Sequence, residues 1–157
     1  MAMTSFNTID RVPATGNKKM FRKILREEWG FDGVAITDFD AVGELIPHGL
    51  AADGKDAAEY ALKAGADIEM MSTNYLNHAR ELIEEGKVDL SLIDEAVWRI
   101  LLLKNKLGLF ENPFKGADPE KEKALHLCQE HLALARKAGS KCVVLLKNEE
   151  NLLPLKK

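Results

Sequence analysis

The sequence predicts an α/β fold in which three parallel strands alternate with helices, as in the C-terminal part of a (β/α)8 TIM-like barrel. Short apolar segments at residues 3–7, 34–37 and 66–71 have the length of strands, and stretches of helical periodicity separate them. The order β-α-β-α-β-α-α favours parallel strands joined by right-handed crossovers. A complete barrel needs eight strands and about 250 residues. This chain has 157 residues, so we expect a partial barrel.

The first strand–helix unit covers residues 3–28. After the strand at 3–7, a turn is expected over 10–17, where proline and glycine interrupt the pattern. Asn17 can cap a helix over 18–28. Its apolar residues, Met20, Phe21, Ile24 and Leu25, share one helical face.

The second unit begins with residues 34–37, a continuous apolar run typical of a parallel strand buried on both faces. A loop over 38–54 follows, with a short helical turn expected at 41–45. Residues 56–64 then have helical periodicity. Gly65 is placed to end this helix, because glycine readily adopts the left-handed conformation found there.

The third unit begins with the strand at 66–71. A helix over 74–85 follows and ends at Gly86. A longer helix over 91–107 keeps its apolar residues at helical spacing and ends at Gly108. These two helices close the part of the chain with barrel-like alternation.

Beyond residue 107 the composition changes. Residues 111–119 are rich in proline, glycine and asparagine, which is typical of a linker. A polar helix over 120–138 and a strand over 142–147 are expected next, as the opening of a second domain. The predicted boundaries are therefore 1–110 for the partial barrel, 111–119 for the linker and 120–157 for the start of the second domain.

Composition and charge exclude several classes of function. The chain is 46% hydrophobic and 30% charged, with 22 basic and 25 acidic residues spread along it. No block of like charge suggests a nucleic-acid partner, and no apolar run is long enough to span a membrane. The first residues lack the features of a signal peptide, and the compartment stays unknown. Cys128 and Cys142 lack metal-like spacing and are expected to be buried, reduced thiols; no metal and no cofactor are expected.

Asp38 directly follows the most buried predicted strand. In barrels of parallel strands, the carboxyl ends of the strands carry the chemistry. Asp38 is therefore a candidate catalytic carboxylate, although an aspartate in this position can also be a cap. Glu69 lies on the next strand, but strand alternation puts it on the face opposite Ile68 and Met70, which argues against a catalytic role.

Six segments resemble, in order and at similar spacing, the glycoside hydrolase family 3 β-glucosidases. The resemblance covers nearly the whole chain. The Ile36-Thr37-Asp38-Phe39 segment matches the family signature of Ser or Thr, Asp and an aromatic residue after an apolar strand. The other segments are MTSFN through PATGN at 3–17, LREEWGFDG at 25–33, HGLAAD at 48–53, LGLFENP at 107–113, and VLLKN with LPL at 144–155.

The resemblance implies a retaining hydrolase of β-linked glycosides, with a (β/α)8-like barrel followed by an α/β sandwich. It puts Asp38 at the position of the nucleophile, which needs an acid/base carboxyl about 5–5.5 Å away. In the family that second carboxyl comes from the later domain, and no residue here matches its motif. The Lys-His pair of the upstream barrel loops is missing too. A fragment that is inactive alone is therefore expected.

Four further residues are candidates for substrate binding by this resemblance. Phe39 stands where tryptophan is common and keeps a smaller aromatic platform. Phe6 stands where many relatives have tyrosine, so a hydroxyl contact near the sugar is lost. Met3 can graze a sugar, and His48 can line the cleft. Arg11 replaces a usual turn glycine, which can strain that turn.

Two other functions fit parts of the sequence. Asp38 and Asp40, after an apolar strand, also resemble the first motif of haloacid-dehalogenase-type phosphatases, in which the pair helps to hold Mg²⁺. Alternatively, the chain is a non-catalytic fragment that self-associates. A partial barrel leaves strand edges at 3–7 and 68–71, so a homo-oligomer through these edges is expected.

Overall fold

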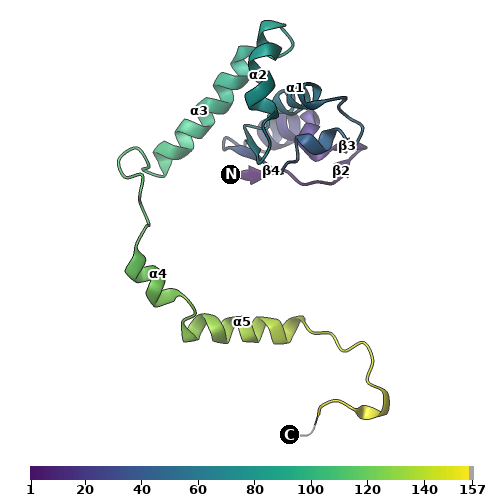
Figure 1. The fold of residues 1–157 in the computed structure, drawn as a ribbon, viewed down its shortest axis with the longest axis vertical. Helices are drawn as coiled ribbons and strands as arrows, with labels where there is room; N and C mark the ends of the chain where they lie inside the picture. Colours follow the sequence, from purple (N-terminus) through teal and green to yellow (C-terminus); the bar gives the residue numbers. More distant parts are fainter. Residues whose placement is uncertain (156–157) are drawn as a thin grey trace. The chain divides into compact units, whose positions relative to one another are not determined.

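The computed structural model describes residues 1–155 and contains the predicted three-stranded parallel sheet. The strands β1 (Ala2–Met3), β4 (Ala35–Phe39) and β5 (Ile68–Met70) lie in the order β1-β4-β5. Met3 pairs with Ile36 and Ile36 pairs with Ile68, and the register shifts before Phe39 pairs with Met70. Figure 1 shows the sheet and its helices in the purple-to-teal part of the chain. The predicted parallel pairing is confirmed.

The chain after β1 differs from the prediction. The first strand was expected to reach residue 7, but it ends at Met3, and Thr4 turns its hydroxyl toward Thr15 in the interior. An antiparallel hairpin of β2 (Thr8–Ile9) and β3 (Val12–Pro13) begins before the expected turn and overlaps its first residues. Asp10 and Arg11 join these strands with φ of 52° and 68°. Two such residues form the turn that suits a two-residue hairpin, and glycine adopts this conformation more easily than arginine.

The helices lie close to their predicted bounds. The first is a π-helix, η2 (Lys19–Glu28), in which the Trp29 amide donates to the carbonyl of Ile24 at 3.0 Å. The helix α1 (Gly54–Ala64) starts two residues earlier than expected, because the Asp53 carboxylate accepts from the amide of Asp56. The others are the single turns η1 (Ala14–Gly16) and η3 (Gly43–Leu45), and the helices α2 (Asn74–Glu84) and α3 (Leu90–Lys106).

The apolar core forms three clusters around α1. One side of α1 packs on the loop after β4, and another packs on α2 and the segment that leads to α3. A third cluster joins η2 to the start of β4 through Phe21, Ala35 and Ala64. Each of the three clusters contains residues of α1, and Tyr75 of α2 packs against the first two.

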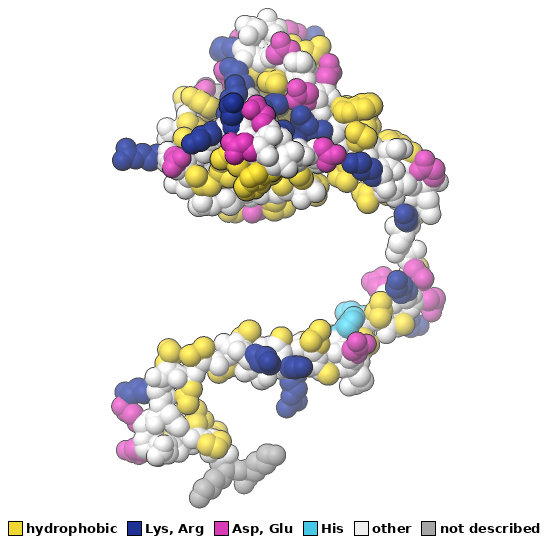
Figure 2. All heavy atoms as spheres, turned by 180° about the vertical axis from the view of Figure 1, so that it is seen from behind, with side chains coloured by type: hydrophobic (Ala, Val, Ile, Leu, Met, Phe, Trp, Pro, Cys, Tyr) yellow, Lys and Arg dark blue, Asp and Glu magenta, His cyan; other side chains and the backbone are white. Residues whose placement is uncertain are grey.

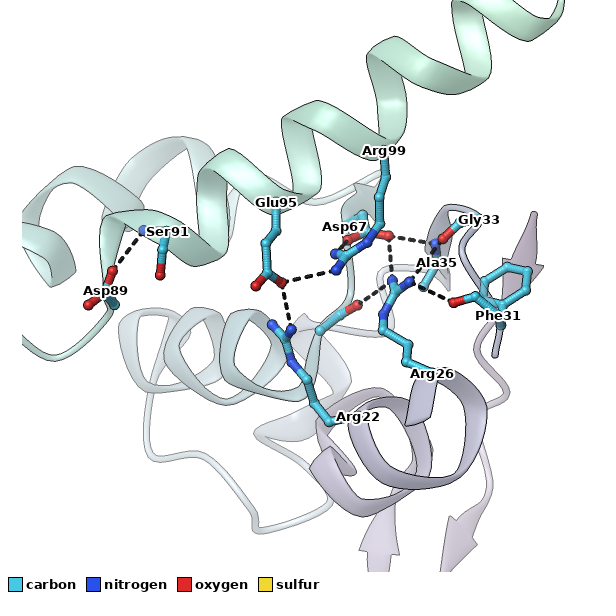
Figure 3. Close-up of polar contacts among 11 residues, drawn as sticks. Arg22, Arg26, Phe31, Gly33, Ala35, Asp67, Asp89, Ser91, Glu95 and Arg99 are labelled. Atoms are coloured by element: carbon cyan, nitrogen blue, oxygen red, sulfur yellow. Dashed lines mark hydrogen bonds and ion pairs between the residues drawn. The ribbon is translucent and has the colours of Figure 1, made fainter. Parts of the chain in front are cut away.

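A network of ion pairs joins η2, β5 and α3 at the amino ends of the strands. The Asp67 carboxylate is 1% exposed and lies 2.8 Å from both Arg26 and Arg99, and it accepts from the amide of Ala35 at 2.8 Å. Glu95 lies 2.7 Å from Arg22 and 3.0 Å from Arg99. Figure 3 shows these side chains converging from three elements. The sequence patterns did not indicate this network.

The second compact unit begins at Phe114, and the first ends at Pro113. Asp118 caps α4 (Pro119–Leu125), and α5 (Gln129–Cys142) follows. The single helix expected over 120–138 is interrupted, because His126 is extended and Leu127 has φ of 52°. The strand expected over 142–147 is wrong: α5 continues to Cys142, and residues 143–148 have no regular structure before the turn η4 (Glu149–Asn151).

The absence of that strand has a physical reason. A strand needs a neighbour to pair its backbone groups, and no strand lies within the described part of the second unit. None of its described residues is buried, and Figure 2 shows apolar side chains exposed along it. Cys142 is exposed and Cys128 is half-buried, so the expected burial of both thiols is wrong, although both are free.

Candidate active site

The candidate nucleophile lies near the carboxyl end of β4. The Asp38 side chain is partly buried, and its Oδ1 accepts from the amide of Phe39 at 2.7 Å. Its own amide donates to Thr4 Oγ1 at 3.3 Å. The bond from Phe39 orients one carboxylate oxygen of Asp38, and the bond to Thr4 joins the Asp38 backbone to the residue that follows β1.

Three buried threonines surround this position: Thr4 directly after β1, Thr15 in the turn η1, and Thr37 on β4 itself. The hydroxyls of Thr4 and Thr15 lie 2.9 Å apart in the interior. Thr37, which precedes Asp38, is fully buried, and its hydroxyl accepts from the amide of Met70 at 2.9 Å. Sequence reasoning placed no role on Thr4 or Thr15. The signal that could have found them is their place in the MTSFN and PATGN segments, which resemble the family motif.

Left-handed backbone conformations mark the ends of β4 and β5. Asp40 has φ of 52° and Met71 has φ of 60°. The Asp40 amide donates to the carbonyl of Met70 at 2.9 Å, so the two strand ends are bonded to each other. Such conformations cost free energy in residues other than glycine and cluster at functional sites.

The predicted substrate-binding residues lie in different parts of the structure. Met3 is 54% exposed at the carboxyl end of β1, and Phe39 is 57% exposed at the end of β4. Because β1 and β4 are parallel neighbours, these side chains belong to the same edge of the sheet. Phe6 is 43% exposed in the segment after β1. His48 is exposed in the loop after η3, and no contact joins its side chain to Asp38 within residues 1–155.

Glu69 has a structural role, because both of its carboxylate oxygens accept hydrogen bonds. One oxygen accepts from the Ser72 hydroxyl at 2.6 Å and from the amide and side chain of Asn74 at 3.0 Å and 2.7 Å. The other oxygen accepts from the amide of Tyr75 at 2.7 Å. The carboxylate therefore ties β5 to the start of α2.

The phosphatase-like alternative needs further acidic groups at later strand ends. Asp67 is an acidic residue beside the next strand, but it precedes β5 and binds Arg26 and Arg99 at the opposite end of the sheet from Asp38. Within the described residues no cluster of three His, Cys, Asp or Glu side chains could hold a metal ion. The same part of the chain has no helix long and apolar enough to cross a membrane.

A known family model covers most of this chain. The family model described as "Glycosyl hydrolase family 3 N terminal domain" matches residues 1–103, which include the three strands of the parallel sheet and Asp38. The chain belongs to glycosyl hydrolase family 3. The family resemblance inferred from the sequence motifs is therefore confirmed, and so is the partial-barrel fold class.

Relatives with this domain are much longer. A periplasmic beta-glucosidase of Salmonella typhimurium is 39% identical over 99% of this chain, and a probable beta-D-xylosidase of Arabidopsis thaliana is 36% identical. A beta-glucosidase from Listeria innocua solved in complex with glucose is 50% identical with a TM-score of 0.81, over 98% of this chain. A mutant of that enzyme holds laminaribiose. The chain spans about a fifth of the length of these family 3 proteins: 21%, 20% and 21% respectively.

Proposed function

We propose that this chain supplies the nucleophile-bearing part of the active site of a retaining β-glycosidase, with Asp38 as the nucleophile. The observation that carries the proposal is the carboxylate of Asp38 near the carboxyl end of β4, with Oδ1 oriented by the Phe39 amide. An oriented, ionised carboxylate at this edge is what a retaining mechanism requires.

In the proposed reaction a carboxylate oxygen of Asp38 attacks the anomeric carbon, and the bond to the leaving oxygen breaks. A second carboxyl gives its proton to that oxygen, and a glycosyl ester forms on Asp38. The second carboxyl, which has lost its proton, then removes a proton from water. The water oxygen attacks the anomeric carbon, the ester bond to Asp38 breaks, and the sugar is released. Glu69 is bonded to four donors, so the acid/base is proposed to lie outside these residues.

The proposed substrate is a terminal β-D-glucoside or a related β-glycoside. Similarity to the Listeria innocua enzyme, whose structures hold glucose or laminaribiose, supports the glucoside. Because other relatives are named xylosidases, a β-xyloside is the second candidate substrate. Phe39, Phe6 and Met3 offer apolar surface for the faces of a sugar ring, and His48 is proposed only as a residue of the cleft wall.

The test uses the complete polypeptide that carries this sequence and an aryl β-glucoside. Asp38→Ala should abolish turnover, and azide should partly restore it, because a small nucleophile can replace the missing carboxylate. Asp94→Ala is the matched control: Asp94 is exposed on α3 and no side-chain partner of it is described. Hydrolysis retained in Asp38→Ala would refute the proposal.

We also propose that residues 1–157 alone lack useful turnover and self-associate. Nucleophile and acid/base act as a unit, so one without the other gives little catalysis. Both β1 and β5 are edge strands, and an apolar hollow of about 170 Å³ between β1 and η2 opens to solvent. Edges and apolar surface of this kind favour pairing with a second copy.

A further inference from the structure

Met71 stands out among the residues at the carboxyl edge of the sheet. It directly follows β5, it is 70% exposed, and it has φ of 60°. The left-handed conformation costs free energy in a residue other than glycine, and such a position persists only where the surroundings determine it.

The backbone on the N-terminal side of Met71 is bonded to both sides of the candidate nucleophile. The Met70 amide donates to Thr37 Oγ1 at 2.9 Å, and the Met70 carbonyl accepts from the Asp40 amide at 2.9 Å. Thr37 precedes Asp38 and Asp40 follows Phe39. The start of the Met71 loop is therefore fixed relative to the segment that carries Asp38.

Glu69 fixes the C-terminal side of the same loop. Its carboxylate accepts from Ser72, Asn74 and Tyr75, at distances between 2.6 and 3.0 Å. A carboxylate at the start of a helix also interacts favourably with the helix dipole. Met71 is thus held between two sets of hydrogen bonds, and its side chain is exposed at the edge where Asp38 lies.

The chemistry of methionine indicates what such a side chain would contact. It has no hydrogen-bond donor and only a weak acceptor, so it cannot select the hydroxyl groups of the sugar that is being cleaved. Its flexible, polarisable thioether packs well against aromatic and apolar groups of varied shape. Exposed Phe39, on the neighbouring strand, adds a second apolar surface.

We propose that Met71 is a specificity-determining residue that contacts an apolar or aromatic leaving group, and that Glu69 is the residue that positions it. The inference rests on the proposed function of Asp38. Glu69 acts through the loop and takes no part in proton transfer, because its two oxygens are already bonded to four donors.

The test compares two substrates of the complete polypeptide: p-nitrophenyl β-glucoside and β-glucosyl fluoride, which has no bulky leaving group. Met71→Gly should lower kcat/KM about fivefold for the aryl glucoside and leave the fluoride almost unchanged, because only the aryl group reaches the thioether. Glycine adopts positive φ without strain, so this variant should fold. Leu90→Ala, a change of an exposed apolar residue at the start of α3, should alter neither.

Glu69 is tested by a double-mutant cycle. Glu69→Ala should reproduce the selective loss on the aryl glucoside, and Glu69→Ala with Met71→Gly should lose no more than Met71→Gly alone, because both act through one side chain. Equal losses on both substrates would indicate a merely structural role and overturn the inference. So would an unchanged ratio of the two substrates in Met71→Gly. Hydrolysis retained in Asp38→Ala would instead overturn the proposed function.

Discussion

The backbone amide of Asp38 donates to the hydroxyl of Thr4, 3.3 Å away, although the two residues are 34 positions apart in the sequence. The end of β1 therefore supports the strand that carries the candidate nucleophile. The Thr4 hydroxyl is in turn 2.9 Å from that of Thr15, so the contact belongs to a buried pair. This links the hairpin region after β1 to the position of Asp38.

Replacing Thr4 should therefore weaken the fold at the site. Thr4→Val keeps the shape of the side chain but leaves the Asp38 amide and the Thr15 hydroxyl without their partner. Loss of a partner for buried polar groups costs about 1–3 kcal/mol. Urea unfolding measures this, with Thr8→Val on the exposed β2 strand as the control. A loss no larger than that of the control would contradict the role assigned to Thr4.

The buried carboxylate of Asp67 should matter more for stability. Asp67→Ala removes the buried carboxylate that both Arg26 and Arg99 bind, and the side chains of these arginines are only 10% and 16% exposed. Breaking one side of a buried ion pair costs about 3–5 kcal/mol. Asp32, 84% exposed beside Lys106, provides the matched control, for which Asp32→Ala should cost less than about 1 kcal/mol. Similar unfolding midpoints for the two variants would contradict this account.

The pH dependence of stability should depend partly on Glu95. Its hydrogen bond with Arg22, and then that with Arg99, lowers the pKa of this carboxyl below the ordinary value of 4.5. A lowered folded-state pKa contributes stability that is present above the unfolded-state pKa and is lost as the pH falls through the folded-state pKa. Thermal melts should show Glu95→Gln less stable than the parent at pH 6, with the difference shrinking below about pH 4.5. A difference that does not depend on pH would exclude this ion pair as its cause.

The isolated 157-residue chain should form dimers or larger assemblies. Trp29 lines the hollow beside β1 and is 73% exposed, so a charge there should prevent a second copy from covering it. Light scattering with size-exclusion chromatography at micromolar concentration should show an assembly for the parent chain and a monomer for Trp29→Lys. Trp98→Lys, at a 65% exposed position on α3, is the control and should still assemble. A stable, cooperatively melting parent monomer would contradict the proposal.

Local patterns predicted the sheet and its helices well, and their success has a physical cause. Three residues of the run at 34–37 are buried and Ile36 is half-buried, and the helix ends coincide with glycines such as Gly65, whose φ is 102°. Periodicity and helix-ending residues report these features directly. The same patterns placed Asp38 directly after the strand; the structure has it within β4, one residue before the strand ends.

Features that depend on distant partners were not predictable in this way. The strand expected over 142–147 was assigned from apolar composition, but a strand forms only with a neighbour to pair with. The ion pairs of Asp67 join residues up to 41 positions apart. Met71 closes the apolar run at 66–71, but it is 70% exposed in a loop that Glu69 holds, and no periodicity reports such a contact.

The central claim is that Asp38 forms the glycosyl-enzyme intermediate, and trapping that ester tests it most directly. The complete polypeptide is incubated with a 2-deoxy-2-fluoro-β-glucoside that has a good leaving group, which slows hydrolysis of the intermediate so that it accumulates. Peptide mass spectrometry should then find one added fluoroglucosyl group on the peptide that contains Asp38, at Asp38 itself. A label on another carboxylate, such as Asp40 or Glu69, would contradict the account, as would hydrolytic activity without any label on Asp38.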